Sequence, residues 1–256
     1  MKLAHELLGY KNILIYQDEE KFKFSLDSTL LADFVKTKKN TKEIIDLGTG
    51  NAPIPLFLSL KTKAQITGIE IQEEVYNLAI DSIKVNKLEN QINIINSDIK
   101  DIYKTVGANR FDIVTSNPPY FKYTPTSNIN KNDYLTIARH EVLINLEQII
   151  IESKKLLIDG GFLYMVHRAE RLSEIIVFLN KHNFGLKRLK FIYSKMSSVG
   201  ALLVLVEARF NKKDDCVVEK PLYVYDNENI YTDEVLKIFN FKKEEYLKIL
   251  KDSIKE

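Results

Sequence analysis

The sequence predicts an α/β fold with an open, mostly parallel sheet of seven strands that ends in an antiparallel hairpin. Two observations predict it. Short apolar runs alternate with segments of helical period from residue 43 to residue 181, as in sheets whose parallel strands are connected by helices. The last two apolar runs follow each other with only a loop between them, which favours an antiparallel pair.

The elements follow from the same pattern. The predicted strands are residues 43–47, 65–69, 92–95, 111–116, 162–167, 186–193 and 201–210. The predicted helices are residues 53–60, 72–87, 146–158 and 169–181, with a short one near 98–105. Gly160 and Gly161 are expected to stop the helix over 146–158. We therefore divide the chain into residues 1–40, a core of residues 41–210, and a C-terminal appendage of residues 211–256 that becomes helical from about Thr232.

Composition limits the classes of function. Lys and Arg number 37 against 35 Asp and Glu, a formal charge of +2, so binding to nucleic acid would need a local basic patch. The single Cys216 excludes a disulfide within the chain and fits a reducing cytosol. No apolar run approaches the ~20 residues that span a bilayer, and no His/Cys cluster suggests a metal. We expect a cytoplasmic protein without membrane or metal partners, and favour a monomer.

Acidic and small residues follow the first three strands. Asp46, Gly48 and Gly50 end the first strand, Glu70 ends the second, and Asp98 follows the third. Glycines let a ligand approach the backbone closely, and the next helix offers free N–H groups. An acid about 20 residues after the glycines is placed to hold a ribose. These spacings predict a site for an adenosine cofactor.

Two features favour S-adenosylmethionine over a nicotinamide dinucleotide. A dinucleotide-binding site has a third glycine that allows the helix to pack closely on the strand. This chain has Pro53 at that position. Asp46, next to the glycines, would repel a pyrophosphate and suits the ammonium group of a methionine moiety.

The tetrapeptide Asn117-Pro118-Pro119-Tyr120 follows the fourth strand. Two prolines end the strand and remove two backbone donors. They hold an amide, a free carbonyl and an aromatic ring at the carboxyl end of the strand. The Asn117 amide oxygen and the Pro118 carbonyl can each accept one N–H of a flat substrate that carries an NH₂ group, while Tyr120 stacks on its plane.

Together these motifs resemble class I S-adenosylmethionine-dependent N6-adenine methyltransferases. Further motifs resemble the bacterial tRNA(Val) (adenine-N6)-methyltransferase family, which modifies an adenine beside the anticodon. They are Phe24-Ser25-Leu26-Asp27, Leu30-Leu31, Ala138-Arg139-His140-Glu141, Val166-His167-Arg168 and Pro221-Leu222-Tyr223-Val224-Tyr225. The resemblance covers about residues 5 to 240 and implies a Rossmann-like class I methyltransferase fold. Ala52 stands where such proteins usually have glycine.

The resemblance also implies residue roles. Asn117, Pro118 and Tyr120 would be catalytic. The cofactor would be bound by Ser25, Asp27, Asp46, Gly48, Gly50, Glu70, Ile71, Asp98, Ile99 and Asn117. Residues 1–40 would close over the cofactor, with Ser25 and Asp27 at its carboxylate end.

Two segments are candidates for contact with RNA. Residues 181–195 contain Lys187, Arg188 and Lys190 among aromatic residues and no acid. The loop after Tyr120 contains Lys122 and Arg139 and is long for a connection without structure of its own.

Other functions stay open at this point. The tetrapeptide also suits a glutamine amide, as in release-factor glutamine N5-methyltransferases. The helical domain that precedes the cofactor motif in those enzymes does not fit into about 40 residues. A NAD-dependent oxidoreductase and a catalytically silent RNA-binding module are the alternatives from other classes.

Overall fold

A computed structural model of the chain describes residues 2–18, 26–120 and 144–253. The main sheet is built from β3 (Glu43–Leu47), β4 (Gln65–Glu70), β5 (Ile92–Asn96), β6 (Phe111–Ser116), β7 (Leu157–Arg168), β8 (Phe184–Lys195) and β9 (Leu203–Phe210). Their order is β5-β4-β3-β6-β7-β9-β8. Pairs from β5 to β7 are parallel, and β9 is antiparallel to both of its neighbours. The predicted strands and the terminal hairpin are therefore confirmed.

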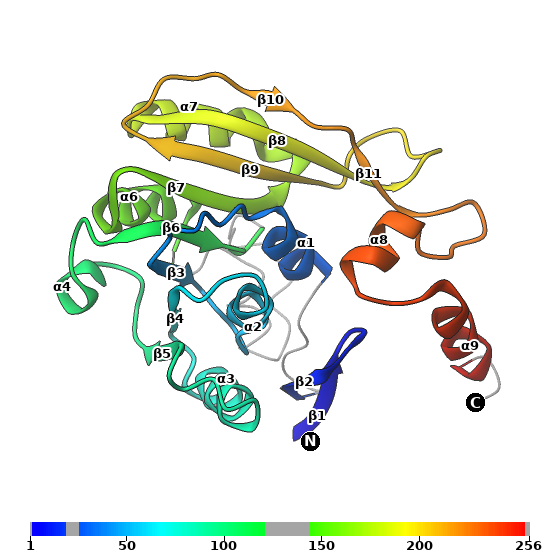
Figure 1. The fold of residues 1–256 in the computed structure, drawn as a ribbon. Coiled ribbons are helices and arrows are strands. Elements are labelled where there is room, and N and C mark those ends of the chain that lie inside the picture. The colour runs from blue at the N-terminus through cyan, green and yellow to red at the C-terminus, as the bar shows by residue number, and fades with distance from the viewer. Residues whose placement is uncertain (1, 19–25, 121–143, 254–256) are drawn as a thin grey trace, which may run out of the picture.

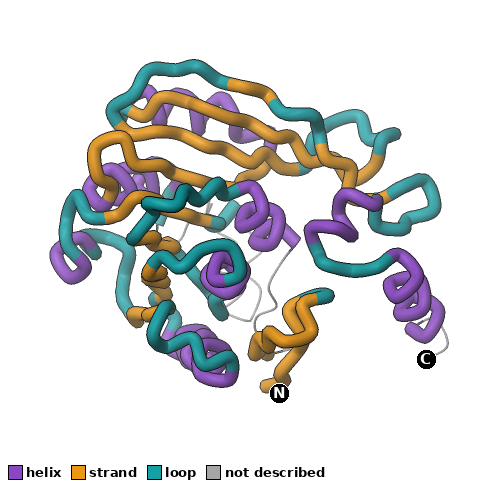
Figure 2. Tube along the Cα trace, viewed as in Figure 1, coloured by secondary structure: helices purple, strands orange, loops and turns teal. Residues whose placement is uncertain are grey.

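Helices cover both faces of the sheet (Figures 1 and 2). They are α1 (Leu26–Phe34), α2 (Pro53–Ser59), α3 (Glu73–Val85), α4 (Tyr103–Val106), α6 (Leu146–Leu156) and α7 (Leu172–Lys181), with a short 3-10 helix (Ala169–Arg171) before α7. Buried side chains of α1, α2 and α3 belong to the core on one face, and those of α4, α6 and α7 to the core on the other. This three-layer arrangement leaves the carboxyl ends of the parallel strands free to carry a site.

The boundary between α6 and β7 differs from the prediction. The helix ends at Leu156 and the strand begins directly at Leu157, so Gly160 and Gly161 lie within β7 instead of stopping the helix. Gly160 has φ +72°, and the register with β6 shifts near Phe111. The apolar pair Leu156-Leu157 continues the helical period into the strand, which is why the pattern placed the end of the helix too late.

The C-terminal residues enlarge the sheet. Two short strands, β10 (Val217–Val218) and β11 (Leu222–Tyr225), pair in parallel with β8 and bring the sheet to nine strands. The helical part is divided into α8 (Asp233–Ile238) and α9 (Lys243–Ser253). Asn240, with φ +59°, lies between them and interrupts the single helical stretch that the pattern suggested.

The N-terminal residues form an antiparallel hairpin of β1 (Lys2–Leu7) and β2 (Tyr10–Asp18), which the sequence pattern did not predict. The hairpin docks on α3 by polar contacts. Asn86 accepts a hydrogen bond from the N–H of Leu14 at 2.9 Å and donates one to its carbonyl at 2.6 Å, while the N–H of Tyr16 donates to the hydroxyl of Ser82 at 2.9 Å. Side chains at the end of α3 thus supply hydrogen-bond partners for backbone groups of β2.

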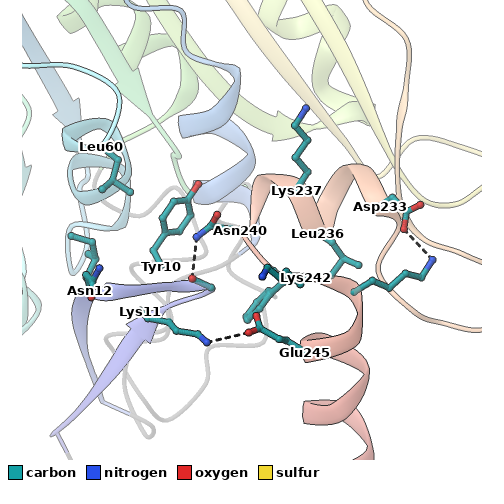
Figure 3. Close-up of a pocket in the computed structure, with 14 residues that line it drawn as sticks. Tyr10, Lys11, Asn12, Leu60, Asp233, Leu236, Lys237, Asn240, Lys242 and Glu245 are labelled. Atoms are coloured by element: carbon teal, nitrogen blue, oxygen red, sulfur yellow. Dashed lines mark hydrogen bonds and ion pairs between the residues drawn. The ribbon is translucent and has the colours of Figure 1, made fainter.

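The hairpin turn is held by the connection between α8 and α9. The N–H of Gly9 donates to the carbonyl of Phe239 at 2.9 Å, and the amide of Asn240 donates to the carbonyl of Gly9 at 3.1 Å. Lys11 and Glu245 face each other across the groove between these two parts, 3.3 Å apart (Figure 3). The N-terminal hairpin and the C-terminal helices are therefore in direct contact. Among the described helices, none is both long and apolar enough to cross a membrane.

Candidate active site

The carboxyl ends of β3, β4, β5 and β6 are neighbours because these strands are adjacent and parallel. Most of the predicted site residues lie at or just beyond these ends: Asp46, Gly48, Gly50, Glu70, Ile71, Asp98, Ile99, Asn117, Pro118 and Tyr120. Asp27 reaches the same edge from the first turn of α1. The fold therefore gathers residues that are separated by up to 93 positions.

The loop after β3 has a backbone that favours glycine. Gly48 and Gly50 have φ +74° and +59°, in the left-handed region. The N–H of Gly48 donates to the carbonyl of Ile69 at 3.0 Å, and the N–H of Gly50 donates to the Glu70 carboxylate at 3.0 Å. Ala52, just before α2, also has a positive φ, +69°. This explains why glycine is usual at its position in the family that the motifs resemble.

The end of β4 carries an acid and an exposed apolar side chain. The Glu70 carboxylate is 5% exposed and also accepts from the N–H of Gln72 at 2.8 Å; burial raises its pKa. Ile71 is 38% exposed, which is unusual for its size. The amide of Asn96 donates to the carbonyls of both Glu70 and Ile71, at 2.9 and 3.1 Å. Sequence reasoning missed Asn96, although a polar amide at the end of the third strand could have indicated it.

Asp46 is fully buried on β3, opposite Thr115 on β6. The hydroxyl of Thr115 donates to one carboxylate oxygen of Asp46 at 2.6 Å, while the other has no hydrogen-bond partner among the described residues. Burial raises the pKa of Asp46 to about 6, and the hydroxyls of Thr115 and Thr49 oppose that shift, although the Thr49 hydroxyl is not in hydrogen-bond geometry with the second oxygen. A buried oxygen without a partner is costly unless a ligand supplies a donor.

The loop after β5 lies beside the glycine loop. Asp98 accepts from the N–H of Lys100 at 2.9 Å, which shapes the turn. A methyl group placed on Gly48 would lie 3.9 Å from the Ile99 side chain, so the two loops are near van der Waals contact.

Asn117 and Tyr120 turn toward α1. The Asn117 amide nitrogen donates to the hydroxyl of Ser28 at 3.1 Å. The Tyr120 hydroxyl lies 2.6 Å from a carboxylate oxygen of Asp27 and 2.7 Å from the amide oxygen of Asn117. Burial raises the pKa of Asp27, and it raises the pKa of Tyr120 well above its ordinary value. Asp27 is thus in contact with two residues of the tetrapeptide region, directly with Tyr120 and through it with Asn117, and Pro118 is buried.

His167, at the end of β7, packs its ring 5.3 Å from that of Tyr120. It is fully buried, and its Nδ1 accepts from the N–H of Arg168 at 2.9 Å. Burial and the nearby charge of Arg171 lower the pKa of His167 to about 3, so the ring is neutral and carries its proton on Nε2. Among the described His, Cys, Asp and Glu residues, no group of three or more is arranged to hold a metal ion.

The basic stretch on β8 does not form a free cationic face. The Arg188 guanidinium is buried between Glu207 and Glu219, with nitrogen–oxygen distances of 2.6 and 2.8 Å, and also donates to the carbonyl of Phe34. Lys187 pairs with Asp215, and Lys190 pairs with Glu234. Arg188, Lys187 and Lys190 are thus all paired with acids distant in the sequence, and the two lysines are only 16% and 15% exposed. Their contact with RNA stays a prediction.

Three predicted site residues, Ser25, Lys122 and Arg139, lie outside the described residues. Their proposed roles stay predictions.

The glycine loop also connects to the N-terminal hairpin. The buried amide of Asn51 donates to the carbonyl of Tyr16 at 2.8 Å. The proposed cofactor loop is therefore attached to β4 on one side and to β2 on the other.

Comparison with known proteins places these features in a family. The family described as Methyltransferase small domain matches residues 23–186. The tRNA1(Val) (adenine(37)-N6)-methyltransferase of Haemophilus influenzae (strain PittGG) is 26% identical over 243 residues, which are 93% of this chain and 97% of that protein. The protein of the same name from Phocaeicola vulgatus is 23% identical over 233 residues, 89% of this chain and 96% of that protein. These matches confirm the resemblance drawn from the motifs.

A solved structure agrees on the fold. The crystal structure of a predicted O-methyltransferase, protein Atu636 from Agrobacterium tumefaciens, has a TM-score of 0.66 at 21% identity and covers 84% of this chain and 96% of that one. The family match extends over more than half of the chain and includes both the glycine loop and the Asn117–Tyr120 tetrapeptide. The chain therefore belongs to the methyltransferase small domain family.

Proposed function

We propose that the protein is an S-adenosylmethionine-dependent methyltransferase that acts on the N6 amine of an adenine in tRNA, in the anticodon loop of a valine tRNA. One observation carries the proposal: the Asn117 amide is held at the carboxyl end of β6, next to the glycine loop that follows β3. Family membership supports methyl transfer, and the names of the two relatives support an adenine in tRNA as the target.

The residues at this edge fit S-adenosylmethionine. The unpartnered, buried oxygen of Asp46 suits the ammonium of the methionine part. Glu70 would accept from the ribose hydroxyls, the exposed face of Ile71 would pack on the adenine, and Asp98 would accept from the adenine amine. Gly48 and Gly50 have no side chains, which suits their positive φ values and would let the cofactor approach the backbone closely.

For this reaction the protein mainly has to align the amine with the methyl group and to supply hydrogen-bond acceptors for the amine. When bound, the cofactor supplies an electrophilic methyl group. An adenine amine is a poor nucleophile because its lone pair is delocalised into the ring. Acceptance of N–H bonds by the Asn117 amide oxygen and the Pro118 carbonyl would draw the lone pair out of the ring plane. The same oxygens would stabilise the positive charge that develops on nitrogen.

The base must leave its stack to reach this edge of the sheet. A tRNA loop offers bases that unstack at low cost. Tyr120 would stack on the base, which requires its hydroxyl to leave its present contacts with Asn117 and Asp27.

The test uses S-adenosylmethionine with a labelled methyl group, offered separately with total tRNA, DNA and release factor. We expect label in tRNA, and N6-methyladenosine after its digestion. Label in release factor would replace the proposal by glutamine methylation, and a lack of transfer to any of the three would overturn it.

The matched variant is Asn117→Ala. It should lower kcat on the order of 100-fold or more, because one preorganised acceptor is lost. Calorimetry should show cofactor affinity close to that of the wild type. A variant that turns over like the wild type would remove Asn117 from the mechanism.

A further inference from the structure

Two acceptor oxygens converge on the Tyr120 hydroxyl. One belongs to the Asp27 carboxylate on α1, at 2.6 Å, and the other to the Asn117 amide after β6, at 2.7 Å. The amide is oriented by its other end, since its nitrogen donates to the hydroxyl of Ser28, which is 5% exposed. The two oxygens are therefore held by different elements of the fold and face the same point.

A phenol cannot satisfy both oxygens. It carries one proton, which it keeps here because burial and the charge of Asp27 raise the pKa of Tyr120 well above its ordinary value. One proton makes one good hydrogen bond, yet both oxygen–oxygen distances are short. A primary amine has two N–H donors and would fill both acceptors at once.

We propose that Asp27 is a further catalytic residue, whose carboxylate accepts an N–H of the target amine beside Asn117 once the Tyr120 hydroxyl has moved away. This inference rests on the proposed function and extends it. It gives the second N–H a side-chain acceptor in addition to the Pro118 carbonyl. The family resemblance implied that Asp27 binds the cofactor, whereas this inference assigns it to the substrate.

The carboxylate suits the charge that the reaction creates. As the amine nitrogen bonds to the methyl carbon, the bond between carbon and sulfur breaks and sulfur keeps that electron pair. The nitrogen then carries one positive charge until it loses a proton. A carboxylate against one of its N–H bonds stabilises this charge and takes the proton, which leaves a neutral methylated amine. Burial raises the pKa of Asp27 and makes it a better proton acceptor than an exposed aspartate.

The decisive variants are Asp27→Asn and Asp27→Ala, with Asp33→Asn as the matched control. Asp33 lies on the same helix but is exposed. Asp27→Asn keeps the shape of the side chain and an acceptor for Tyr120, so the fold should be retained, and thermal unfolding verifies it. We expect kcat on tRNA to fall on the order of 100-fold in Asp27→Asn, with no change in Asp33→Asn.

Two binding measurements separate this role from a cofactor or structural role. The first is the affinity for S-adenosylhomocysteine, which should be the same in the wild type and both Asp27 variants. The second compares tRNA that carries adenine with tRNA that carries purine, which lacks the amine, at the methylated position. The wild type should bind the adenine form more tightly, and Asp27→Ala should lose on the order of 10-fold of that preference.

Two results would overturn the inference. One is a fall in cofactor affinity that parallels the fall in rate, because it would return Asp27 to the cofactor. The other is a preference for adenine over purine that is unchanged in Asp27→Ala. If the wild type itself transfers no methyl group to tRNA, the proposed function fails instead, so the two failures are distinguishable.

Discussion

Asp46 and Thr115 face each other across the β3–β6 pair, and the Thr115 hydroxyl donates to the Asp46 carboxylate at 2.6 Å. The bond satisfies one oxygen of a fully buried acid, while the second oxygen has no hydrogen-bond partner among the described residues. The protein therefore keeps a group in its core that opposes folding at neutral pH. Such a cost is typical of residues that serve a ligand.

The first prediction concerns this cost. The folded pKa of Asp46 is about 6, above the ordinary 3.8, so the folded state binds the proton more tightly than the unfolded state. The free energy of unfolding should fall as the pH rises through this window, and the loss should be complete above it. Asp46→Asn removes the titration and keeps an acceptor for Thr115. It should raise the free energy of unfolding by at most about 3 kcal/mol at neutral pH.

Urea unfolding near pH 4 and near pH 7.5 provides the measurement. The gain should be present only at the higher pH, and the same variant should bind S-adenosylmethionine at least about 10-fold more weakly, since a partner for its ammonium is lost. Equal stability of wild type and variant at both pH values would contradict the burial argument.

The second prediction concerns Ala52, whose φ of +69° is strained for alanine. Glycine relieves that strain but loses a buried methyl group and gains freedom in the unfolded chain. Ala52→Gly should therefore change the free energy of unfolding by less than about 0.5 kcal/mol. Ala208→Gly, equally buried in β9 but without a positive φ, should cost at least about 1 kcal/mol more. Equal losses in thermal unfolding would show that Ala52 is not strained.

The third prediction concerns the Tyr120 hydroxyl as an occupant of the substrate position. Tyr120→Phe keeps the ring for stacking and removes the group that contacts Asn117. The variant should bind substrate tRNA several-fold more tightly, whereas Tyr120→Ala should bind it at least about 10-fold more weakly, because base stacking is lost. Fluorescence anisotropy at fixed salt measures both. Weaker binding by Tyr120→Phe would mean that the hydroxyl assists the substrate.

The fourth prediction concerns Arg188, which joins three parts of the fold. Its guanidinium contacts Glu207 on β9, Glu219 after β10 and the carbonyl of Phe34 at the end of α1. Arg188→Ala leaves buried acceptors without a donor and should cost about 3–5 kcal/mol in the free energy of unfolding. Lys220→Ala, an exposed change nearby, should cost less than about 0.5 kcal/mol. A small loss for Arg188→Ala would show that its ion pairs do not hold these three parts together.

The fifth prediction concerns the contact between the hairpin and the C-terminal helices. A methyl group on Gly9 would lie 2.3 Å from the carbonyl oxygen of Asn240, so Gly9→Ala cannot keep this contact. Amide hydrogen exchange should become faster along Tyr10–Asp18 in the variant. Gly200→Ala is the control, because nothing lies within 4 Å of the added methyl group. Unchanged exchange in Gly9→Ala would show that α3 alone holds the hairpin.

The sequence predicted the sheet because each of its strands is a local signal. The runs that became β3, β4 and β6 are apolar, short and followed by glycine, acid or proline, so their type and ends are visible without neighbours. The end of α6 was misplaced because the next strand begins without a break in the apolar pattern. The hairpin of β1 and β2 was not predicted because polar side chains of α3 hold it in place, and its own sequence pattern does not indicate two strands.

In the candidate site, too, residues with a local signal were predicted and contacts between distant residues were not. Asn117 was identified from two adjacent prolines, and Gly48 from its place after a strand. The contacts of Tyr120 with Asp27 and of Arg188 with Glu219 join residues 93 and 31 positions apart. Such pairs depend on how helices and strands pack, so local spacing does not reveal them. The run of cations therefore did not reveal that Arg188 forms ion pairs within the fold.

The strand order β7-β9-β8 has a consequence for synthesis on the ribosome. Within the described residues, the strands that pair with β8 are β9, β10 and β11, and all three are later in the sequence. When β8 leaves the exit tunnel, its hydrogen-bonding edges have no partner, and the nascent chain must hold a strand with unpaired edges in solution until Leu203–Phe210 follows. Translation pauses between these two strands would prolong this exposure and favour aggregation of the newborn protein.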